Sequence, residues 1–276
     1  MVSPRSIPCS FLTLLASLLP AWHSAIAEDK PLSFIESFDS GSESTLLRDR
    51  LKKSDTAGIE NQAGPDKSDA LRVTYLSGKR GSVGISESVR IGFSAPVVSL
   101  SYDLKFAEDF DFSRGGKLPG LGPEEHVTGG KPMHRNGWSA RPMWREDGLL
   151  TSYTYHQDKP ERHGHYSRSN GFFFTRGKFH AVTVVVAVNS ARGEKDGRVE
   201  IYVDGELQVT HENLDLHASE NPERAYAGRL LFTTFHGGND SSWAPRDAEG
   251  NFRNVTAWFD NVSVVKGKQI RPAPGK

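Results

Sequence analysis

The residues of this chain that are best suited to chemistry fall into three short groups. A lysine stands in a glycine-rich run, a serine and an arginine are one residue apart, and so are two tyrosines. These residues are Lys117, Ser139, Arg141, Tyr153 and Tyr155. Arginine is always cationic, lysine can be tuned by its surroundings, and tyrosine can give or take a proton. The set is suited to binding a carboxylated sugar and moving a proton.

Two of these groups have i, i+2 spacing, which places both side chains on one face of a β-strand. Between them, Arg145-Glu146-Asp147-Gly148-Leu149 predicts a hairpin turn. A three-residue loop with Gly148 in the left-handed conformation would place Ser139 opposite Tyr155 and Arg141 opposite Tyr153. All four side chains would then lie on one face of the hairpin. A two-residue loop would move both tyrosines to the opposite face. We favour the three-residue loop, although Pro142 then needs a position where the ladder requires no N–H.

The elements that must position these residues are short strands. Apolar runs are β-branched or aromatic and end at Gly, Asp, Asn or Ser, and no amphipathic helix follows the N-terminal segment. The expected strands are 71–76, 97–106, 148–156, 180–189, 199–203, 206–210, 229–235 and 256–265. Asp204-Gly205 predicts a two-residue hairpin, and residues 34–38 are expected to pair near residues 258–262. The pattern predicts an all-β fold, a β-jelly roll built as a concanavalin A-like sandwich of two antiparallel sheets.

The two ends of the chain are expected to lie outside this domain. Residues 1–27 read as a signal peptide, because Arg5 precedes an apolar run and Ser24-Ala25-Ile26-Ala27 offers a cleavage site. The run is too short to span a bilayer. We therefore expect a secreted or periplasmic protein without a membrane span. Residues 28–265 are expected to form the domain, and residues 266–276 a disordered tail.

Composition excludes several functional classes. The single cysteine, Cys9, lies in the predicted signal peptide, so neither a disulfide framework nor a cysteine-ligated metal is expected. Lys+Arg and Asp+Glu both number 34, so bulk charge gives no reason to expect a nucleic-acid partner. We expect a monomer with no cofactor and no metal. The pair His163-Gly164-His165 is expected in a solvated loop, the alternatives being a groove wall or a metal ligand.

The three chemical groups resemble the pattern of polysaccharide lyase family 14, the alginate and polyuronate lyases with a β-jelly roll. The likeness covers roughly residues 33–265 and continues in four further runs: 138–145, 196–205, 234–240 and 259–262. It implies a lyase that cleaves an acidic polyuronate, of alginate or glucuronan type, by β-elimination. The implied active site is Lys117, Ser139, Arg141, Tyr153 and Tyr155. Pro142 and Glu124-Glu125-His126 depart from the family pattern.

Such a lyase removes the proton at C5 of a uronate, next to the carboxylate, and expels the O4 oxygen. Arg141 and Lys117 are expected to neutralise the carboxylate and the charge that develops beside it, with Ser139 bonded to the carboxylate or to Lys117. Either tyrosine could transfer the proton, since nearby cations can stabilise a phenolate whose reference pKa is near ~10. Tyr155 is the choice here because it faces Ser139, and Lys117 remains an alternative base.

Three more residues are expected to contact the substrate. Trp138 and Trp144 flank the serine–arginine pair, and His236 precedes Gly237-Gly238. The rival interpretation is a non-catalytic, lectin-like module that uses the two tryptophans and the two tyrosines as platforms for sugar rings. Such a module needs the aromatic residues but not the combination of lysine, arginine and tyrosine, which favours the enzyme.

Overall fold

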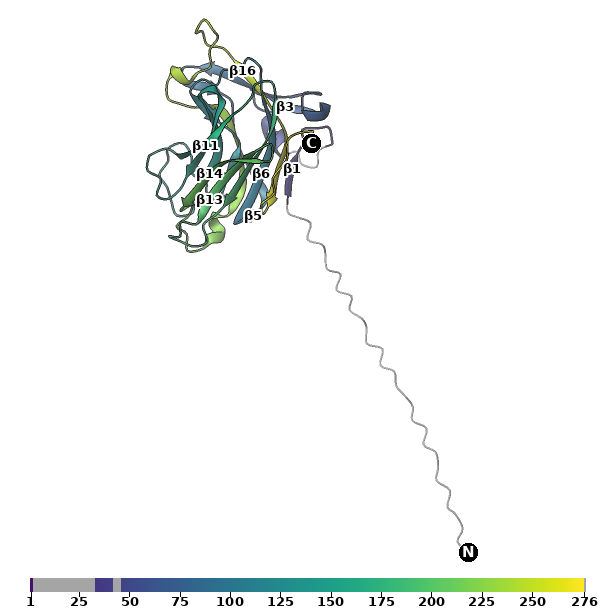
Figure 1. The fold of residues 1–276 in the computed structure, drawn as a ribbon, viewed down its shortest axis with the longest axis vertical. Helices are drawn as coiled ribbons and strands as arrows, with labels where there is room; N and C mark the ends of the chain where they lie inside the picture. Colours follow the sequence, from purple (N-terminus) through teal and green to yellow (C-terminus); the bar gives the residue numbers. More distant parts are fainter. Residues whose placement is uncertain (2–32, 42–45, 276) are drawn as a thin grey trace. The chain divides into compact units, whose positions relative to one another are not determined.

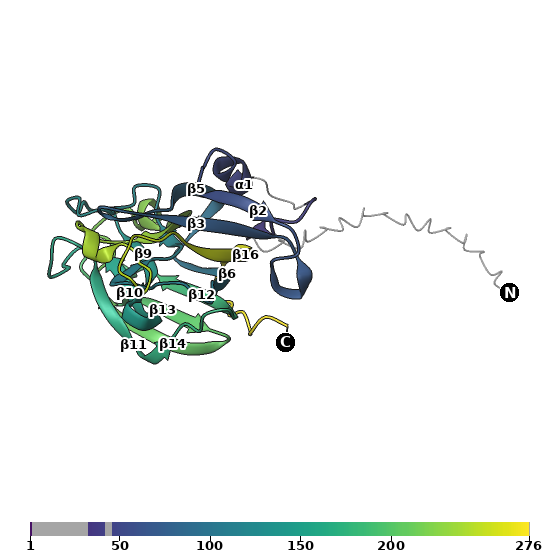
Figure 2. The same cartoon turned by 90° about the horizontal axis from the view of Figure 1, so that it is seen from above.

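The computed structural model describes residue 1, residues 33–41 and residues 46–275. Apart from Met1, the predicted signal peptide lies outside the described residues. Within them, the strands form two antiparallel sheets, drawn in two views in Figures 1 and 2. No helix in the described ranges is long and apolar enough to cross a membrane. The predicted all-β jelly roll of two antiparallel sheets is confirmed.

The larger sheet holds nine strands within the described residues. They are β1 (Ser33–Glu36), β2 (Ala57–Glu60), β3 (Ala70–Gly78), β4 (Gly81–Val83), β6 (Val97–Phe106), β12 (Phe179–Ala187), β13 (Gly197–Val203), β14 (Glu206–Leu214) and β16 (Val255–Lys266). Their order is β14-β13-β12-β6-β16-β3-β2, with β1 paired to β16 and β4 to β3.

The smaller sheet carries the chemical residues. Its strands are β5 (Ile85–Ala95), β7 (Gly115–Lys117), β8 (Gly120–Gly122), β9 (Ser139–Arg145), β10 (Leu149–Tyr155), β11 (His165–Phe173) and β15 (Ala227–His236). Their order is β11-β10-β9-β7-β15-β5, and β8 pairs with both β9 and β15. The helical segments are α1 (Leu46–Leu51) and the single 3-10 turns η1 (Pro65–Lys67), η2 (Glu146–Gly148), η3 (Pro222–Ala225) and η4 (Ser241–Trp243).

The main core lies between the two sheets because each strand turns one set of alternate side chains inward. Leu100 of β6, Val184 of β12 and Phe232 of β15 belong to this core and have no exposed surface. Full burial of such side chains contributes about 1.5–3 kcal/mol each relative to an exposed position. The alternation also determines which residues of β9 and β10 are free to form a site.

The local pairings predicted from the sequence are confirmed. Each expected strand corresponds to an observed one, with ends that shift by a few residues. Val203 pairs with Glu206 across Asp204-Gly205, and both turn residues have positive φ angles of 55° and 90°. These angles are those of a type I′ turn. The early strand β1 pairs with β16, with Glu36 opposite Val262.

The hairpin β9–β10 has the three-residue loop that we favoured. Tyr153 lies opposite Arg141, and Tyr155 lies opposite Ser139. Gly148 has a φ of 87°, as the loop requires. Pro142 accepts a hydrogen bond from the backbone N–H of Leu118. The backbone N and O atoms of a residue in an antiparallel strand point toward the same neighbour. The Pro142 nitrogen, which has no hydrogen to donate, therefore points toward the β7–β8 connection and leaves the pairing with β10 intact.

The prediction of a disordered tail is wrong for the residues just after β16. Gly267 donates its N–H to Val97 and accepts a bond from the Ser99 hydroxyl, and Arg271 bonds Thr183 and Ser263. Arg271 also lies 3.5 Å from a carboxylate oxygen of the buried Asp103. The segment is therefore docked on the larger sheet. Its Lys, Pro and Gly content gave no sign of this, because the partners come from distant strands.

Candidate active site

The hairpin β9–β10 presents different residues on its two faces. Ala140, Trp144 and Leu150 belong to the main core between the sheets. The alternate residues Met143, Tyr153 and Tyr155 pack in a separate cluster with Val127. We call the second surface the hairpin face; its members are Ser139, Arg141, Met143, Tyr153 and Tyr155. Lys117 joins it from β7, because Lys117 lies opposite Met143 in the sheet. The structure thus brings together all five residues that the resemblance implied.

Arg141 is a buried cation with few partners. Its side chain is 2% exposed, and its one hydrogen bond goes from Nη1 to the hydroxyl of Thr233, at 3.4 Å. The Nε and Nη2 atoms have no hydrogen-bond partner among the described residues. Burial lowers the pKa of Arg141 from its usual value. An incompletely paired, buried guanidinium is unfavourable by itself, and a carboxylate is the group that best pairs with it.

The ring of Tyr153 lies near two cations. The Nζ atom of Lys117 is 5.7 Å from the centre of this ring, and Cζ of Arg141 is 5.8 Å from it. Lys117 also lies 4.6 Å from the ring centre of Phe235. Burial, and secondarily the charge of Arg141, lowers the pKa of Lys117 to about 8. Lys117 is therefore charged below this pH and increasingly neutral above it.

The two tyrosines contact each other and have different surroundings. Their ring centres are 5.7 Å apart in an edge-to-face arrangement. Burial, followed by a hydrogen bond to Tyr155, raises the pKa of Tyr153 above its usual value. The hydroxyl oxygen of Tyr155 accepts a hydrogen bond from the backbone N–H of Gly130, at 2.9 Å. Tyr153 therefore holds its proton more firmly than a tyrosine in water does.

Ser139 anchors a covering segment. Its hydroxyl donates to the backbone oxygen of Val127 at 2.7 Å, and its side chain is fully buried. The same segment donates from Gly130 to Tyr155, so it covers the hairpin face. In this conformation Ser139 does not orient Lys117, since its proton is given to a backbone carbonyl; the predicted bond to a substrate carboxylate stays a prediction. Ser139 positions the segment that closes over the site.

The three expected substrate contacts are wrong. Trp138 and Trp144 have no exposed surface, and their Nε1 atoms donate to the backbone oxygens of Ala225 and Phe112. Side chains at even-numbered positions of this hairpin point into the main core. Trp138 and Trp144 therefore point away from the hairpin face. His236 is also buried; its ring stacks on Phe110, and burial lowers its pKa to about 4. All three residues therefore pack in or against the main core and not on the hairpin face.

Sequence reasoning missed several neighbours of the site. Thr233, on β15, is the hydrogen-bond partner of Arg141, and Val127 and Gly130 hold the covering segment in place. His126 is close enough that the charge of Arg141 contributes, after burial and Arg229, to lowering its pKa. The sequence offered one weak signal, the position of His126 in a run that departs from the family pattern. The other contacts depend on pairings between distant strands.

Comparison with known proteins shows which family the chain belongs to. The sequence profile described as polysaccharide lyase 14 matches residues 65–255, more than half of the chain. The chain belongs to the polysaccharide lyase 14 family. It is therefore a polysaccharide lyase, and the enzyme class predicted from the sequence is confirmed. The matched residues of this polysaccharide lyase include all of the hairpin face, Lys117 and Thr233.

Solved structures resemble this polysaccharide lyase over most of its length. The marine PL-14 alginate lyase from Aplysia kurodai has a TM-score of 0.66 and 24% identity, covering 86% of this chain and 99% of that chain. Alginate lyase Aly36B has a TM-score of 0.65 and 22% identity, covering 87% and 99%. The endo-β-1,4-glucuronan lyase from the fungus Trichoderma reesei has a TM-score of 0.54 and 15% identity, covering 81% and 92%. At these identities the likeness shows the fold. The comparison with curated proteins found no match.

Proposed function

We propose that this polysaccharide lyase cleaves an acidic polyuronate, of alginate or glucuronan type, by β-elimination at C5–H and O4. The observation that carries the proposal is the buried Arg141 guanidinium, two of whose nitrogens have no partner among the described residues. A uronate carboxylate would supply the missing acceptors in a site with little water, where the pairing is strong. The neighbouring Lys117 adds a second positive charge below pH about 8.

In the proposed reaction, Arg141 and Lys117 hold the carboxylate and the negative charge that develops when C5 loses its proton. Tyr155, as the phenolate, takes the C5 proton. The electron pair of the C5–H bond forms the C4=C5 double bond, and the C4–O4 bond breaks. The proton goes to the departing O4 oxygen. In mannuronate and glucuronate, H5 and O4 lie on the same side of the ring, so one tyrosine can act as base and then as acid.

Tyr155 is the proposed proton carrier because it lies opposite Ser139 and its oxygen accepts a hydrogen bond from the backbone N–H of Gly130. Tyr153 is the less suitable base, because burial, followed by its hydrogen bond with Tyr155, raises its pKa above the usual value. Guluronate places H5 and O4 on opposite sides of the ring and needs a second group. Lys117, whose pKa is lowered to about 8, is the candidate for that task.

Substrate access requires the covering segment to move. Tyr155 is 1% exposed in this conformation, because the chain from Val127 to Gly130 lies over it. Hydrogen bonds that hold this segment down include those from Ser139 to Val127 and from Gly130 to Tyr155, and also those from Val127 to Trp138 and from Arg162 to Gly130. Opening on polymer binding and closing over the sugar would exclude water from the reaction, as mobile loops do in other enzymes.

The neighbouring structures support the choice of substrate class. Two are alginate lyases and one is a glucuronan lyase. A variant of Aly36B, with one lysine and one tyrosine changed to alanine, was solved with an alginate tetrasaccharide. A lysine and tyrosines also define the site here. For this chain we further propose export, on the strength of the predicted signal peptide; mass spectrometry of the exported protein should find its start near Glu28 rather than Met1.

An ultraviolet assay for the new double bond tests the proposed function. Purified protein is incubated with alginate, polymannuronate, polyguluronate and glucuronan, and absorbance is followed with time. We expect product from at least one polymer and none with the Arg141→Ala variant. Binding of a polymer by wild-type protein without any rise in absorbance would support a lectin-like role instead.

A further inference from the structure

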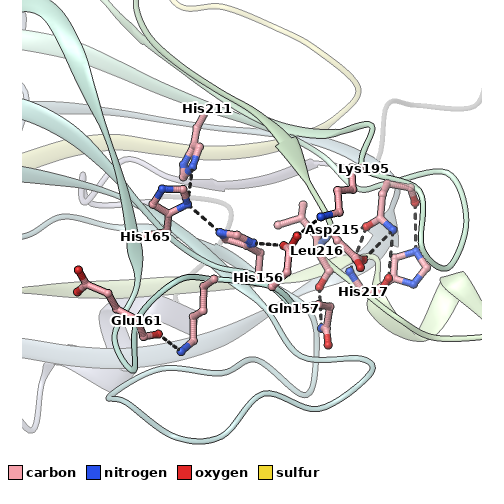
Figure 3. Close-up of polar contacts among 12 residues, drawn as sticks. His156, Gln157, Glu161, His165, Lys195, His211, Asp215, Leu216 and His217 are labelled. Carbon is pink, nitrogen blue, oxygen red and sulfur yellow. Dashed lines mark hydrogen bonds and ion pairs between the residues drawn. The ribbon is translucent and has the colours of Figure 1, made fainter.

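Three histidines converge at a place that the proposed reaction does not use. The Nδ1 atom of His165 lies 2.9 Å from Nε2 of His156 and 3.2 Å from Nε2 of His211. The three ligand atoms all lie within 4.8 Å of one another. Figure 3 shows the three rings pointing toward one another. His156 and His211 are buried, and His165 is half-buried.

The three rings come from both sheets. His156 follows the end of β10, and His165 begins β11 and lies opposite Thr154. His211 belongs to β14, the edge strand of the larger sheet. Strands β11 and β14 are the edges of their sheets on the same side of the molecule, and they lie next to each other (Figures 1 and 2). The cluster lies on the opposite face of β10 from Tyr153 and Tyr155, since even-numbered residues turn to the inter-sheet side.

Hydrogen bonds among the rings cannot satisfy all three nitrogens. Nδ1 of His156 lies 2.8 Å from a carboxylate oxygen of Asp158, so in the neutral ring the proton is on Nδ1 and Nε2 is bare. The Nδ1 atom of His165 can carry one proton, which it can share well with only one of its two neighbours. With all three rings neutral, one of the two short N···N contacts therefore lacks a well-directed proton. A cation at the centre would be a shared partner for all three nitrogens.

The outer contacts are those of metal-binding histidines. Asp158 orients His156 through its carboxylate and is itself paired with Lys195. The hydroxyl of Ser152 lies 3.0 Å from Nδ1 of His211, which fixes that ring with Nε2 toward the centre. A carboxylate on the far nitrogen, as Asp158 is for His156, is a usual arrangement around zinc-bound histidines.

We propose that His156, His165 and His211 bind a divalent transition-metal ion of the zinc type. Zinc–nitrogen bonds of about 2.0–2.1 Å in tetrahedral geometry place ligand nitrogens about 3.3 Å apart, close to the two shorter separations seen here. Three imidazoles favour Zn²⁺, Cu²⁺ or Ni²⁺ over Ca²⁺ and Mg²⁺, which prefer oxygen ligands. A water molecule would complete the coordination. This site was not expected from the sequence, which suggested a solvated loop for His165.

The location gives the metal a structural role. It would link the edge of the smaller sheet, through His156 and His165, to the edge of the larger sheet, through His211. It would also fix the end of β10 directly after Tyr155. Because binding requires all three rings in their folded positions, its free energy would add to the stability of the folded protein.

The experiment measures metal binding and stability, not lyase activity, so it is independent of the proposed function. Wild-type protein is freed of metal with a chelator and titrated with ZnCl₂ by calorimetry, and with CoCl₂ by visible absorption. Thermal unfolding is recorded with and without zinc. The variants are His165→Ala, His211→Gln and Asp158→Asn, with His163→Ala as control, because His163 is exposed and lies outside the cluster.

We expect one zinc ion per chain, visible absorption of tetrahedral Co²⁺, and a Tm increase of about 5–10 °C at a hundredfold excess over Kd. His163→Ala should match wild type. His165→Ala and His211→Gln should lose the stoichiometric site, and Asp158→Asn should weaken it about 10–100-fold. The proposal is overturned if wild type binds zinc no more tightly than either histidine variant, or if zinc leaves its Tm unchanged. Should one variant fail to fold, the other two and the wild-type titration decide the question.

Discussion

At the scale of single residues, the charges around the two tyrosines decide what the site can do. Arg141 stays cationic at every pH the enzyme meets, while Lys117 titrates near pH 8. The ring of Tyr153 lies near both cations, and burial raises its pKa. In the proposed mechanism this arrangement separates two tasks: permanent neutralisation of a carboxylate by the arginine, and proton transfer by a tyrosine.

Replacing Tyr155 by Phe removes one oxygen and little volume, so folding should be retained. Loss of the proton carrier should lower kcat by about 10²–10⁴-fold. Steady-state assays of double-bond formation give the rate, and circular dichroism checks the fold. Tyr202→Phe, a change on β13 of the larger sheet where the hydroxyl donates to Glu200, should behave as wild type. If Tyr155→Phe and Tyr153→Phe both kept near-normal activity, the tyrosine mechanism would be wrong.

Arg141→Met should separate stability from activity. Methionine retains much of the side-chain volume but removes a buried, incompletely paired charge, so the Tm should be unchanged or higher. Without the fixed counter-charge for the carboxylate, kcat/KM should fall by about 10²–10³-fold or more. Thermal unfolding and kinetics measure the two effects. A variant with normal kcat/KM would show that Arg141 does not bind the uronate.

The pH profile of kcat/KM should report Lys117. Its pKa is lowered to about 8, and the charged form exists below that value. If Lys117 acts as a cation, activity should fall as the pH rises through about 8. Lys117→Arg keeps the charge to much higher pH and should move this decline upward. Activity that instead rises through pH 8 with wild type, and not with the arginine variant, would identify Lys117 as the base.

At the scale of elements, close contact between backbones positions Arg141. Gly120 of β8 lies directly beside Ala140 and Arg141, and a methyl group there would overlap the carbonyl oxygen of Ala140 and Cγ of Arg141. Gly116 of β7 similarly leaves room for the ring of Trp144. Glycine in the short strands β7 and β8 thus allows their backbones to pack closely against β9. This close packing determines the position of the Arg141 side chain.

Gly120→Ala should therefore disturb both stability and activity. Overpacking of this kind costs about 1–3 kcal/mol, and the displaced arginine should reduce kcat/KM more than the loss of stability explains. Gly58→Ala on β2 is a matched control, because nothing lies within 4 Å of the methyl group it would add. Thermal unfolding and kinetics at a temperature well below Tm distinguish the two effects. Equal behaviour of both variants would contradict this role of Gly120.

At the scale of the whole molecule, the C-terminal segment is part of the sandwich. Arg271 lies against the buried Asp103, whose pKa is raised by burial and held down in part by Arg271. A chain that ends at Lys266 leaves this carboxylate without its cation. We expect a loss of about 1–3 kcal/mol, greater as the pH rises and Asp103 must ionise. Chemical unfolding at two pH values measures it, and a chain that ends at Pro272 should retain wild-type stability.

The sequence alone determined the local parts of this protein. Strand periodicity, the Asp204-Gly205 turn and the three-residue loop at Gly148 depend on neighbouring residues, so each could be predicted before the fold was known. The register of β9 and β10 followed from that loop, and it placed Arg141 opposite Tyr153. The set of five chemical residues, and the family it resembles, could be recognised in the same way.

Only the tertiary structure decided which surfaces are covered. The alternation of side chains along a strand predicts that Trp138 and Trp144 share a face. Both faces of β9 carry apolar residues, however, so the sequence does not show which face is buried. The position of the second sheet determines which face belongs to the core. For the same reason Ser139 bonds a covering segment, residues 267–271 dock on the larger sheet, and His211 meets His165 from the opposite sheet. Burial and long-range pairing depend on segments far away in the chain, and such contacts leave no local pattern in the sequence.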